Sequence, residues 1–235
     1  MKKAIFFIYF FLFSYCIFSK NLIISDNSSE CKDFIRGFLS ENTINKKFIL
    51  TCGTINFPKY KKYKYPIFSA LTTYCMNLKK IALQETKYPS ILSQIKIVDN
   101  ITQRKNVYGI LLKNKNEINC FKKLKIKNLK IFTLKKNYEI PYVINKALKS
   151  CDVIILYPEK FLKNPLILEF IIKKIILSGK TYIAYEKKFI NLGAVAVFFV
   201  DYYMEGKRFK KLITEKNLKN KIIFPKYFKV LTTKN

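Results

Sequence analysis

The sequence predicts an α/β fold with mostly parallel sheets, and two observations carry this prediction. Apolar runs of about five to eight residues alternate with segments of helical periodicity along the chain, which is the pattern of βαβ units. Runs such as VIILYP (153–158) are apolar on both faces, as expected when helices cover both sides of a parallel sheet. Half of the 235 residues are hydrophobic, which is enough to build one large core or two small lobes.

The expected elements are bounded by turn and capping residues. Asn164-Pro165 supplies an N-cap and a first-turn proline, and Ser178-Gly179 supplies a stop, so a helix buried against the sheet is expected at 165–177. The expected strands are 21–25, 47–53, 65–72, 80–84, 106–113, 129–135, 152–158, 180–185, 194–200 and 222–231. The other expected helices are 28–39, 89–101, 116–124, 140–148 and 202–217.

The N-terminus has the pattern of an export signal. Lys2 and Lys3 precede the 15-residue apolar segment Ala4–Phe18, which is shorter than the roughly 20 residues of a membrane span. A signal peptide at 1–19 is therefore expected, with an uncleaved anchor as the alternative. Bulky Tyr15 disfavours lipidation at Cys16. We expect an exported, periplasmic protein.

Composition excludes several kinds of chemistry. The formal net charge is +30, but only three of the 45 basic residues are arginines, and the lysines are spread over the whole chain. This distribution favours a solvated surface over a nucleic-acid-binding stripe. The sequence has no histidine, which removes histidine bases and histidine metal ligands, and no cofactor is expected. The cysteines show no CxxC or zinc spacing, so buried thiols are favoured over disulfides.

Five of the 15 acidic residues fall at or just after the carboxyl ends of expected strands. In open α/β sheets that edge is where ligands bind. Acids in this position also cap the following helix, so each one has two readings. As a set, they predict a pocket edge that prefers an amine or a hydroxyl-rich ligand. The five acids are Asp26, Glu85, Glu159, Glu186 and Asp201.

Three segments carry a resemblance to a known family. GAVAVFFVDYYMEGKRF (193–209) and KALKSCDVIILYPEKFLKN (146–164) resemble the ABC-transporter substrate-binding proteins of the type I periplasmic binding fold, of tryptophan/tyrosine-type or uncharacterised uptake components. FILTCGT followed by YPIFSALT (65–72) is similar to the family's first strands. The resemblance covers about residues 45–233.

The resemblance implies two Rossmann-like lobes with parallel sheets that close on a ligand. The N-terminal lobe would comprise 20–104 with about 193–217, and would be shorter than in the family. The C-terminal lobe would comprise 105–190 with about 218–235. The implied ligand-binding residues are Thr54, Thr72, Tyr157, Glu159, Tyr185, Glu186, Asp201 and Tyr202. Tyr185 departs from the family pattern, which has serine there, so the cleft is expected to be reshaped.

The resemblance also implies the function and the partners. The protein would be the exported solute-binding component of an ABC uptake transporter, with no catalytic step, delivering a small molecule to a permease in the inner membrane. An amino-acid-like solute is one candidate. Two alternatives remain open: a reduced relative acting as a periplasmic sensor or accessory protein, and a basic surface-binding protein that uses KYKKYKY (59–65).

Overall fold

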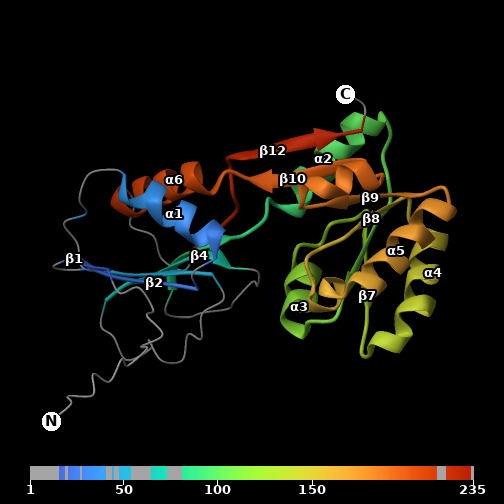
Figure 1. The fold of residues 1–235 in the computed structure, drawn as a ribbon, viewed down its shortest axis with the longest axis horizontal. Coiled ribbons are helices and arrows are strands. Elements are labelled where there is room, and N and C mark those ends of the chain that lie inside the picture. Colours follow the sequence, from blue (N-terminus) through green and yellow to red (C-terminus); the bar gives the residue numbers. More distant parts are fainter. Residues whose placement is uncertain are drawn as a thin grey trace, which may run out of the picture.

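The computed structural model has two α/β lobes, each built on a six-stranded sheet (Figure 1). It describes residues 16–18, 21–26, 28–40, 44, 48–53, 65–72, 81–215 and 221–233. Thr54 and nearly all of the expected signal peptide lie outside these residues, so the signal peptide stays a prediction. Within the described part, no helix is both long and apolar enough to cross a bilayer.

The first sheet has the order β1-β2-β3-β4-β5-β11, in which only the β1–β2 pair is antiparallel. Helices α1 and α6 lie side by side on one face of this sheet (Figure 1), with Phe34, Phe38 and Phe209 in the core between them and the strands. Among the described residues, no helix covers the other face. The strands are β1 (Cys16–Phe18), β2 (Asn21–Ser25), β3 (Ile49–Cys52), β4 (Ile67–Thr72), β5 (Ile81–Thr86) and β11 (Lys221–Ile223), and the helices are α1 (Ser29–Leu39) and α6 (Tyr202–Glu215).

The second sheet has the order β12-β10-β9-β8-β6-β7, with β12 antiparallel to β10 and all other pairs parallel. Helices α2 and α3 pack on one face and α4 and α5 on the other, which gives three layers with two cores. The strands are β6 (Tyr108–Leu112), β7 (Leu129–Thr133), β8 (Val153–Ile155), β9 (Thr181–Ala184), β10 (Ala196–Val200) and β12 (Phe228–Thr232), and the helices are α2 (Ile91–Thr102), α3 (Lys115–Lys123), α4 (Ile140–Ser150) and α5 (Pro165–Leu177).

The expected α/β fold class is confirmed, but the chain divides between the lobes differently from the expected boundaries. Helix α2 packs on the second sheet, through Ile91, Ile95 and Val98. Strand β10 is hydrogen-bonded within the second sheet, and only the helix after it returns to the first lobe. The single strand expected at 222–231 is two strands in different sheets, since β11 pairs with β5 and β12 pairs with β10. Pro225, which has no N–H to donate to a sheet, lies between them.

Helix α5 shows how local capping defines an element. The Asn164 side chain accepts hydrogen bonds from the N–H groups of Leu166 and Ile167, and Pro165 occupies the first turn, as predicted. The helix packs against the sheet as expected, through Ile171, Ile172 and Ile175, but its apolar residues are not all covered, because Leu166 is 74 % exposed and Leu177 is 83 % exposed. Only one face of α5 packs on the sheet.

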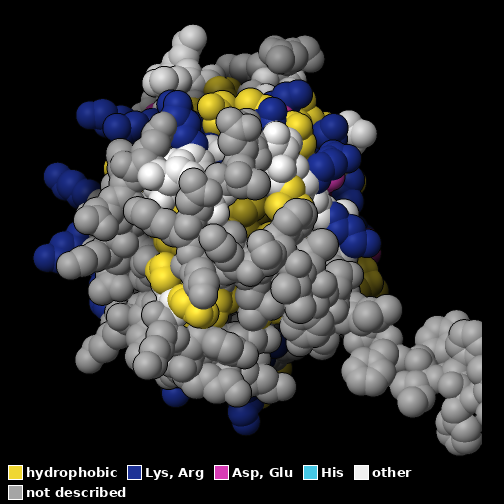
Figure 2. Space-filling model, turned by 90° about the vertical axis from the view of Figure 1, so that its left-hand side faces the viewer, with side chains coloured by type: hydrophobic (Ala, Val, Ile, Leu, Met, Phe, Trp, Pro, Cys, Tyr) yellow, Lys and Arg dark blue, Asp and Glu magenta, His cyan; other side chains and the backbone are white. Residues whose placement is uncertain are grey.

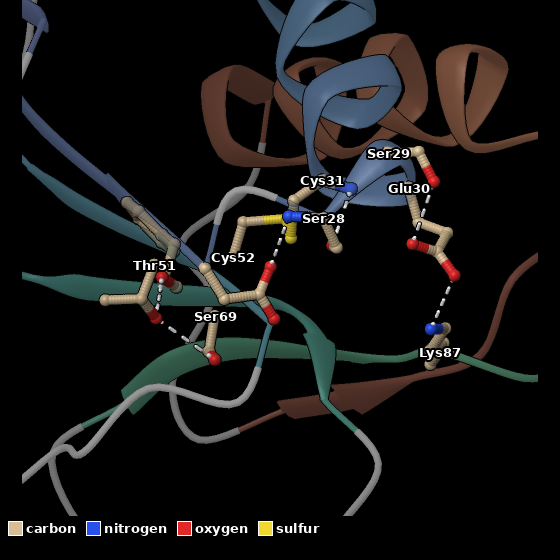
Figure 3. Close-up of a disulfide and its surroundings, with 10 residues drawn as sticks. Ser28, Ser29, Glu30, Cys31, Thr51, Cys52, Ser69 and Lys87 are labelled. Atoms are coloured by element: carbon tan, nitrogen blue, oxygen red, sulfur yellow. Dashed lines mark hydrogen bonds and ion pairs between the residues drawn. A yellow bond between two sulfur atoms is a disulfide. The ribbon is translucent and has the colours of Figure 1, made fainter. Parts of the chain in front are cut away.

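The cysteines also differ from expectation. Cys31 of α1 and Cys52 of β3 form a disulfide that joins helix to sheet in the first lobe (Figure 3). Cys120 is disulfide-bonded as well. The preference for thiols is therefore wrong for these three residues, whereas Cys151 is a buried free thiol as predicted.

Candidate ligand-binding site between the lobes

Three short segments connect the lobes. Residues 87–90 lead from β5 to α2, Asp201 leads from β10 to α6, and residues 224–227 lead from β11 to β12. We call these segments the first, second and third crossings, in that order. The Asp201 N–H donates to the Tyr227 carbonyl oxygen at 2.9 Å, so the second and third crossings run side by side. The carboxyl ends of the parallel strands β8 and β9 lead toward the same region, which is where ligands bind in open α/β sheets.

An aromatic cluster fills the junction between the first crossing and the second lobe. The ring centroid of Tyr88 lies 4.6 Å from that of Tyr185 and 5.8 Å from that of Tyr157. Phe121 of α3 packs edge-on against Tyr157 at 5.2 Å. The Tyr185 hydroxyl donates to Gln94 Oε1 at 2.9 Å, which anchors the cluster to α2. Such edge-to-face contacts give the cluster a defined geometry.

Groups from both lobes approach the Tyr88 hydroxyl. Burial raises the pKa of Tyr88 well above its ordinary value, and the charges of Tyr202, Tyr185, Glu30 and Glu186 raise it further. Tyr202 and Glu30 belong to the helices of the first lobe, whereas Tyr185 and Glu186 follow β9 of the second. The hydroxyl of Tyr88 therefore marks the place where the two lobes face each other.

Glu30 ties the first lobe to the first crossing. Its carboxylate lies 2.9 Å from Lys87 Nζ, and both side chains are partly buried (Figure 3). Burial by itself would raise the pKa of Glu30, but the hydrogen bond and the charge of Lys87 hold it below its usual value. The ion pair keeps one acid at the cleft ionised.

Two buried carboxyl groups lie behind the aromatic cluster. Glu159 is 6 % exposed, and its Oε1 accepts hydrogen bonds from the N–H groups of Lys113 (2.8 Å) and Asn114 (3.0 Å), just before α3. Glu117, on the buried face of α3, is hydrogen-bonded to Glu159. Burial, and then the charge of Glu159, raise the pKa of Glu117 to about 8. Glu117 thus holds a proton at neutral pH.

A pocket opens beside these groups, with a volume of about 430 Å³ counted to its open mouth. It lies between the first crossing, the third crossing and α3, and its lining is largely apolar. A largely apolar lining with a few polar groups is the composition of small-molecule sites. The lining includes Thr86, Tyr88, Glu117, Phe121, Tyr157 and Phe224.

The structure brings several of the expected site residues to this region. Tyr157 and Tyr185 belong to the aromatic cluster, Tyr202 lies near Tyr88, and Glu186 is exposed at the rim with Lys188 at 2.6 Å. Tyr202 is partly buried, and burial raises its pKa above its usual value.

Other expected residues have a structural use or fall outside the described part. Asp201 Oδ1 accepts a hydrogen bond from the Met204 N–H at 3.1 Å, so the capping reading of Asp201 is correct. Glu159 fixes the segment before α3 rather than pointing an unengaged carboxylate into the cleft. Thr72 ends β4, in the first lobe. Thr54 lies outside the described residues.

Sequence reasoning missed Tyr88, Glu117 and Phe121. Glu117 and Phe121 are one helical turn apart on the buried face of α3, so an acid on an otherwise apolar stripe was the available signal. Tyr88 follows the strand that ends in Gln84-Glu85-Thr86 and precedes Pro89, but nothing local distinguishes a crossing segment from a loop.

Comparisons with known proteins identify the fold. No protein-family model matches the chain, and no curated protein matches its sequence. Among solved structures, a substrate-binding protein with adhesive properties from Clostridium difficile, in its ligand-free, open structure, matches with a TM-score of 0.57 and 11% identity, over 91% of this chain and 92% of that one.

Two further solved structures match at a lower level. An ABC domain in complex with L-Trp from Streptococcus pneumonia has a TM-score of 0.50 and 12% identity, over 87% of this chain and 78% of that one. A conserved domain protein from Vibrio cholerae has a TM-score of 0.50 and 13% identity, over 86% and 76%. The chain therefore has the type I periplasmic-binding-protein fold.

Proposed function

We propose that this protein is the exported solute-binding component of an ABC uptake transporter and holds a small ligand between its two lobes. The observation that carries the proposal is the convergence of tyrosines and acids from both lobes around Tyr88, at the crossing segments. A mostly apolar pocket with a few polar groups adjoins this point, which suits a small organic molecule. The similarity in fold to a substrate-binding protein supports the same reading.

The proposed mechanism is closure of the lobes on the ligand. The crossing segments are short, so a small change in their backbone angles would swing one lobe against the other. A ligand that touches both lobes stabilises the closed form, and this form would dock on the permease in the inner membrane. The proposed contacts are Tyr88, Tyr157, Tyr185, Glu186, Asp201 and Tyr202, with Thr54 and Thr72 contributed by the first lobe.

A thermal-shift screen of the exported form, residues 20–235, tests the binding function. Amino acids and other small metabolites are added one at a time, and a true ligand at 100 times its Kd stabilises the folded state by about 2.7 kcal/mol. We expect at least one solute to raise the melting temperature by several degrees. A broad panel that leaves the melting temperature unchanged would contradict the function.

A matched pair of variants locates the site. Glu186 and Glu169 are both exposed acids, each 2.6 Å from a lysine, but only Glu186 lies at the cleft. Glu186→Gln should weaken binding of the solute found in the screen, whereas Glu169→Gln on α5 should leave it unchanged. Equal affinities in both variants would remove Glu186 from the site.

Export and the partner need separate tests. N-terminal sequencing of the protein from the periplasmic fraction should find Lys20 as the first residue, if the proposed signal is cleaved after Ser19. Cross-linking in membranes should join the ligand-loaded protein to a permease more strongly than the ligand-free protein. Retention of the protein in the cytoplasmic fraction would contradict the transport role.

A further inference from the structure

A buried acid lines the pocket, and no basic residue described in the structure pairs with it. Glu117 is 3 % exposed, and within the described part of the chain its hydrogen-bonding partner is the carboxyl group of Glu159. Burying an ionisable group beside another of the same charge costs stability unless a further group compensates for it. The chain has 45 basic residues and 15 acidic ones, so basic side chains that could neutralise a buried acid are abundant in this protein. A cation supplied from outside would complete this site.

The backbone N–H groups near the pocket that could bind an anion are already hydrogen-bonded to Glu159. The N–H groups of Lys113 and Asn114, at the start of α3, would suit a ligand carboxylate, but both donate to Glu159 Oε1. The Lys113 side chain is directed to Asn137, with Nζ 3.0 Å from its Oδ1. Among the described residues that line the pocket there is no lysine or arginine. A ligand with a free carboxylate therefore finds no counter-charge there.

The other walls suit the body of an organic cation. The rings of Tyr88, Phe121 and Tyr157 line the pocket and pack against one another at centroid distances of 5.2 and 5.8 Å. Aromatic faces attract cations and cover apolar carbon at the same time.

We propose that this pocket binds an organic amine with an aromatic or apolar body and no free carboxylate, and that its ammonium group pairs with Glu117. The inference rests on the proposed function, and it names the class of solute. On binding, the neutral Glu117 carboxyl releases its proton to solvent and the ammonium takes its place beside Glu159. One proton is released to solvent for each amine bound, and the ligand itself is not chemically changed.

The proton balance makes affinity depend on pH. Burial raises the pKa of Glu117 to about 8, so the protein must give up this proton at neutral pH. The titratable groups that face Glu117 are Glu159 and Tyr157 from the segment after β8 and Tyr88 from the first crossing, and burial raises the pKa of both tyrosines above their ordinary value. Cys120, on the same helix, is in a disulfide and does not titrate. As the pH is raised toward about 8, the affinity for the amine should increase about tenfold per pH unit, because less work is needed to remove the proton.

Calorimetric titration of the full-length protein tests the inference. The probes are tyramine and tryptamine, each compared with the amino acid that has the same side chain, L-tyrosine and L-tryptophan. We expect each amine to bind at least about tenfold tighter than its amino acid, since the carboxylate lacks a partner. At pH 7, titrations in buffers of different ionisation enthalpy should show release of close to one proton.

Glu117→Gln, which keeps the size and a hydrogen bond to Glu159, should weaken amine binding by at least about tenfold, whereas Glu169→Gln should not. Unliganded melting curves show whether the variants are folded, and proton release by the wild type needs no variant. Tight binding of the amino acids without the amines would overturn this inference and leave the proposed function intact. Amine binding without proton release and with equal affinity in Glu117→Gln would also overturn it. Failure of every solute in the wider screen would overturn the proposed function as well.

Discussion

Gly206 of α6 packs directly on the backbone of Phe34 in α1, so closely that a Cβ atom at Gly206 would overlap the Phe34 carbonyl oxygen. Gly37 makes the reciprocal approach to the Tyr203 carbonyl oxygen. The two helices are far apart in sequence, yet they form a single layer over the first sheet (Figure 1). The rings of Phe34 and Phe209 are in edge contact, with their centroids 5.5 Å apart. Because α6 follows the second crossing, this contact attaches that crossing to the first lobe.

Gly206→Ala should therefore destabilise the protein despite the better helix propensity of alanine. The added methyl group has to push two backbones apart, and overpacking of this kind costs about 1–3 kcal/mol or more. Urea unfolding followed by circular dichroism measures the loss. Lys146→Ala, at an exposed position of α4, is the control and should change the free energy of unfolding by less than about 0.5 kcal/mol. A stabilised Gly206→Ala would contradict the close packing.

Glu205 holds the third crossing in place. Its side chain is fully buried, pairs with Arg208 Nε at 2.5 Å and accepts hydrogen bonds from the N–H groups of Lys226 and Tyr227. Arg208 in turn donates to the Phe224 carbonyl oxygen at 3.0 Å. Glu205→Ala would remove the carboxylate that pairs with the partly buried Arg208 and that accepts from two N–H groups, and should cost about 3–5 kcal/mol.

The exposed pair on α5 is the control for the Glu205 variant. Glu169 and Lys173 also form an ion pair on one helix, at 2.6 Å, but both side chains are more than half exposed. Glu169→Ala should change the free energy of unfolding by no more than about 1 kcal/mol. Comparable losses in the two variants would show that the third crossing does not depend on Glu205.

The Cys31–Cys52 disulfide should stabilise the first lobe. It closes a loop with a sequence separation of 21 residues, for which loop entropy predicts about 3 kcal/mol. The Cys31→Ser, Cys52→Ser double variant should melt at a lower temperature than the wild type in oxidising buffer. Reducing agent should lower the melting temperature of the wild type more than that of the variant. A wild-type melting temperature that does not respond to reductant would argue against this bond.

Glu117 should make stability depend on pH in a defined direction. Its pKa is about 8 in the folded protein and 4.5 as a reference, so the folded state holds a proton that the unfolded state has lost between these values. Stability therefore falls as pH rises through this window, by up to about 1.4 kcal/mol per pH unit. Glu117→Gln cannot ionise, so its advantage over the wild type should grow from pH 5 to pH 8. Parallel stability curves for the two proteins would contradict the raised pKa.

Periodicity and capping predicted the elements well because both are local. Helix α5 has the bounds that Asn164-Pro165 and Ser178-Gly179 indicate, and strands β2 to β10 lie within or close to the expected runs, whereas the short β1 was not expected. Assignment to a lobe is a different problem, because it depends on which strands pair across long sequence separations. The run that ends at Val200 looks the same whether it joins the first sheet or the second, and the structure places it in the second.

The candidate site was best anticipated at the ends of parallel strands, where one edge of a sheet brings side chains together. The family resemblance placed Tyr157 and Tyr185 there, and their ring centroids lie 6.2 Å apart. The contributions of Tyr88 and Glu117 come from a crossing segment and from the inner face of a helix, and these positions are defined only by tertiary packing. The Cys31–Cys52 pair was missed for the same reason, since nothing in the local spacing brings α1 onto β3.

The described basic side chains on the face shown in Figure 2 are not clustered, as the even distribution of lysines along the sequence predicts. Figure 2 views the molecule from the end of the first lobe, and the described lysines and arginines are distributed around the outline of this face rather than gathered in one stripe. Binding of anionic lipid or DNA that is driven by these side chains should be weak and should fall steeply with salt. Vesicle and DNA titrations at two salt concentrations measure this dependence. Tight, salt-resistant binding would contradict it.

Small-angle X-ray scattering, with and without a saturating solute from the thermal-shift screen, tests the central claim most directly. If the ligand sits between the lobes and draws them together, the radius of gyration should decrease on saturation, and Glu205→Ala, which loosens the third crossing, should start from a larger value. A solute that binds stoichiometrically while the scattering curve stays the same would contradict binding by closure of the cleft.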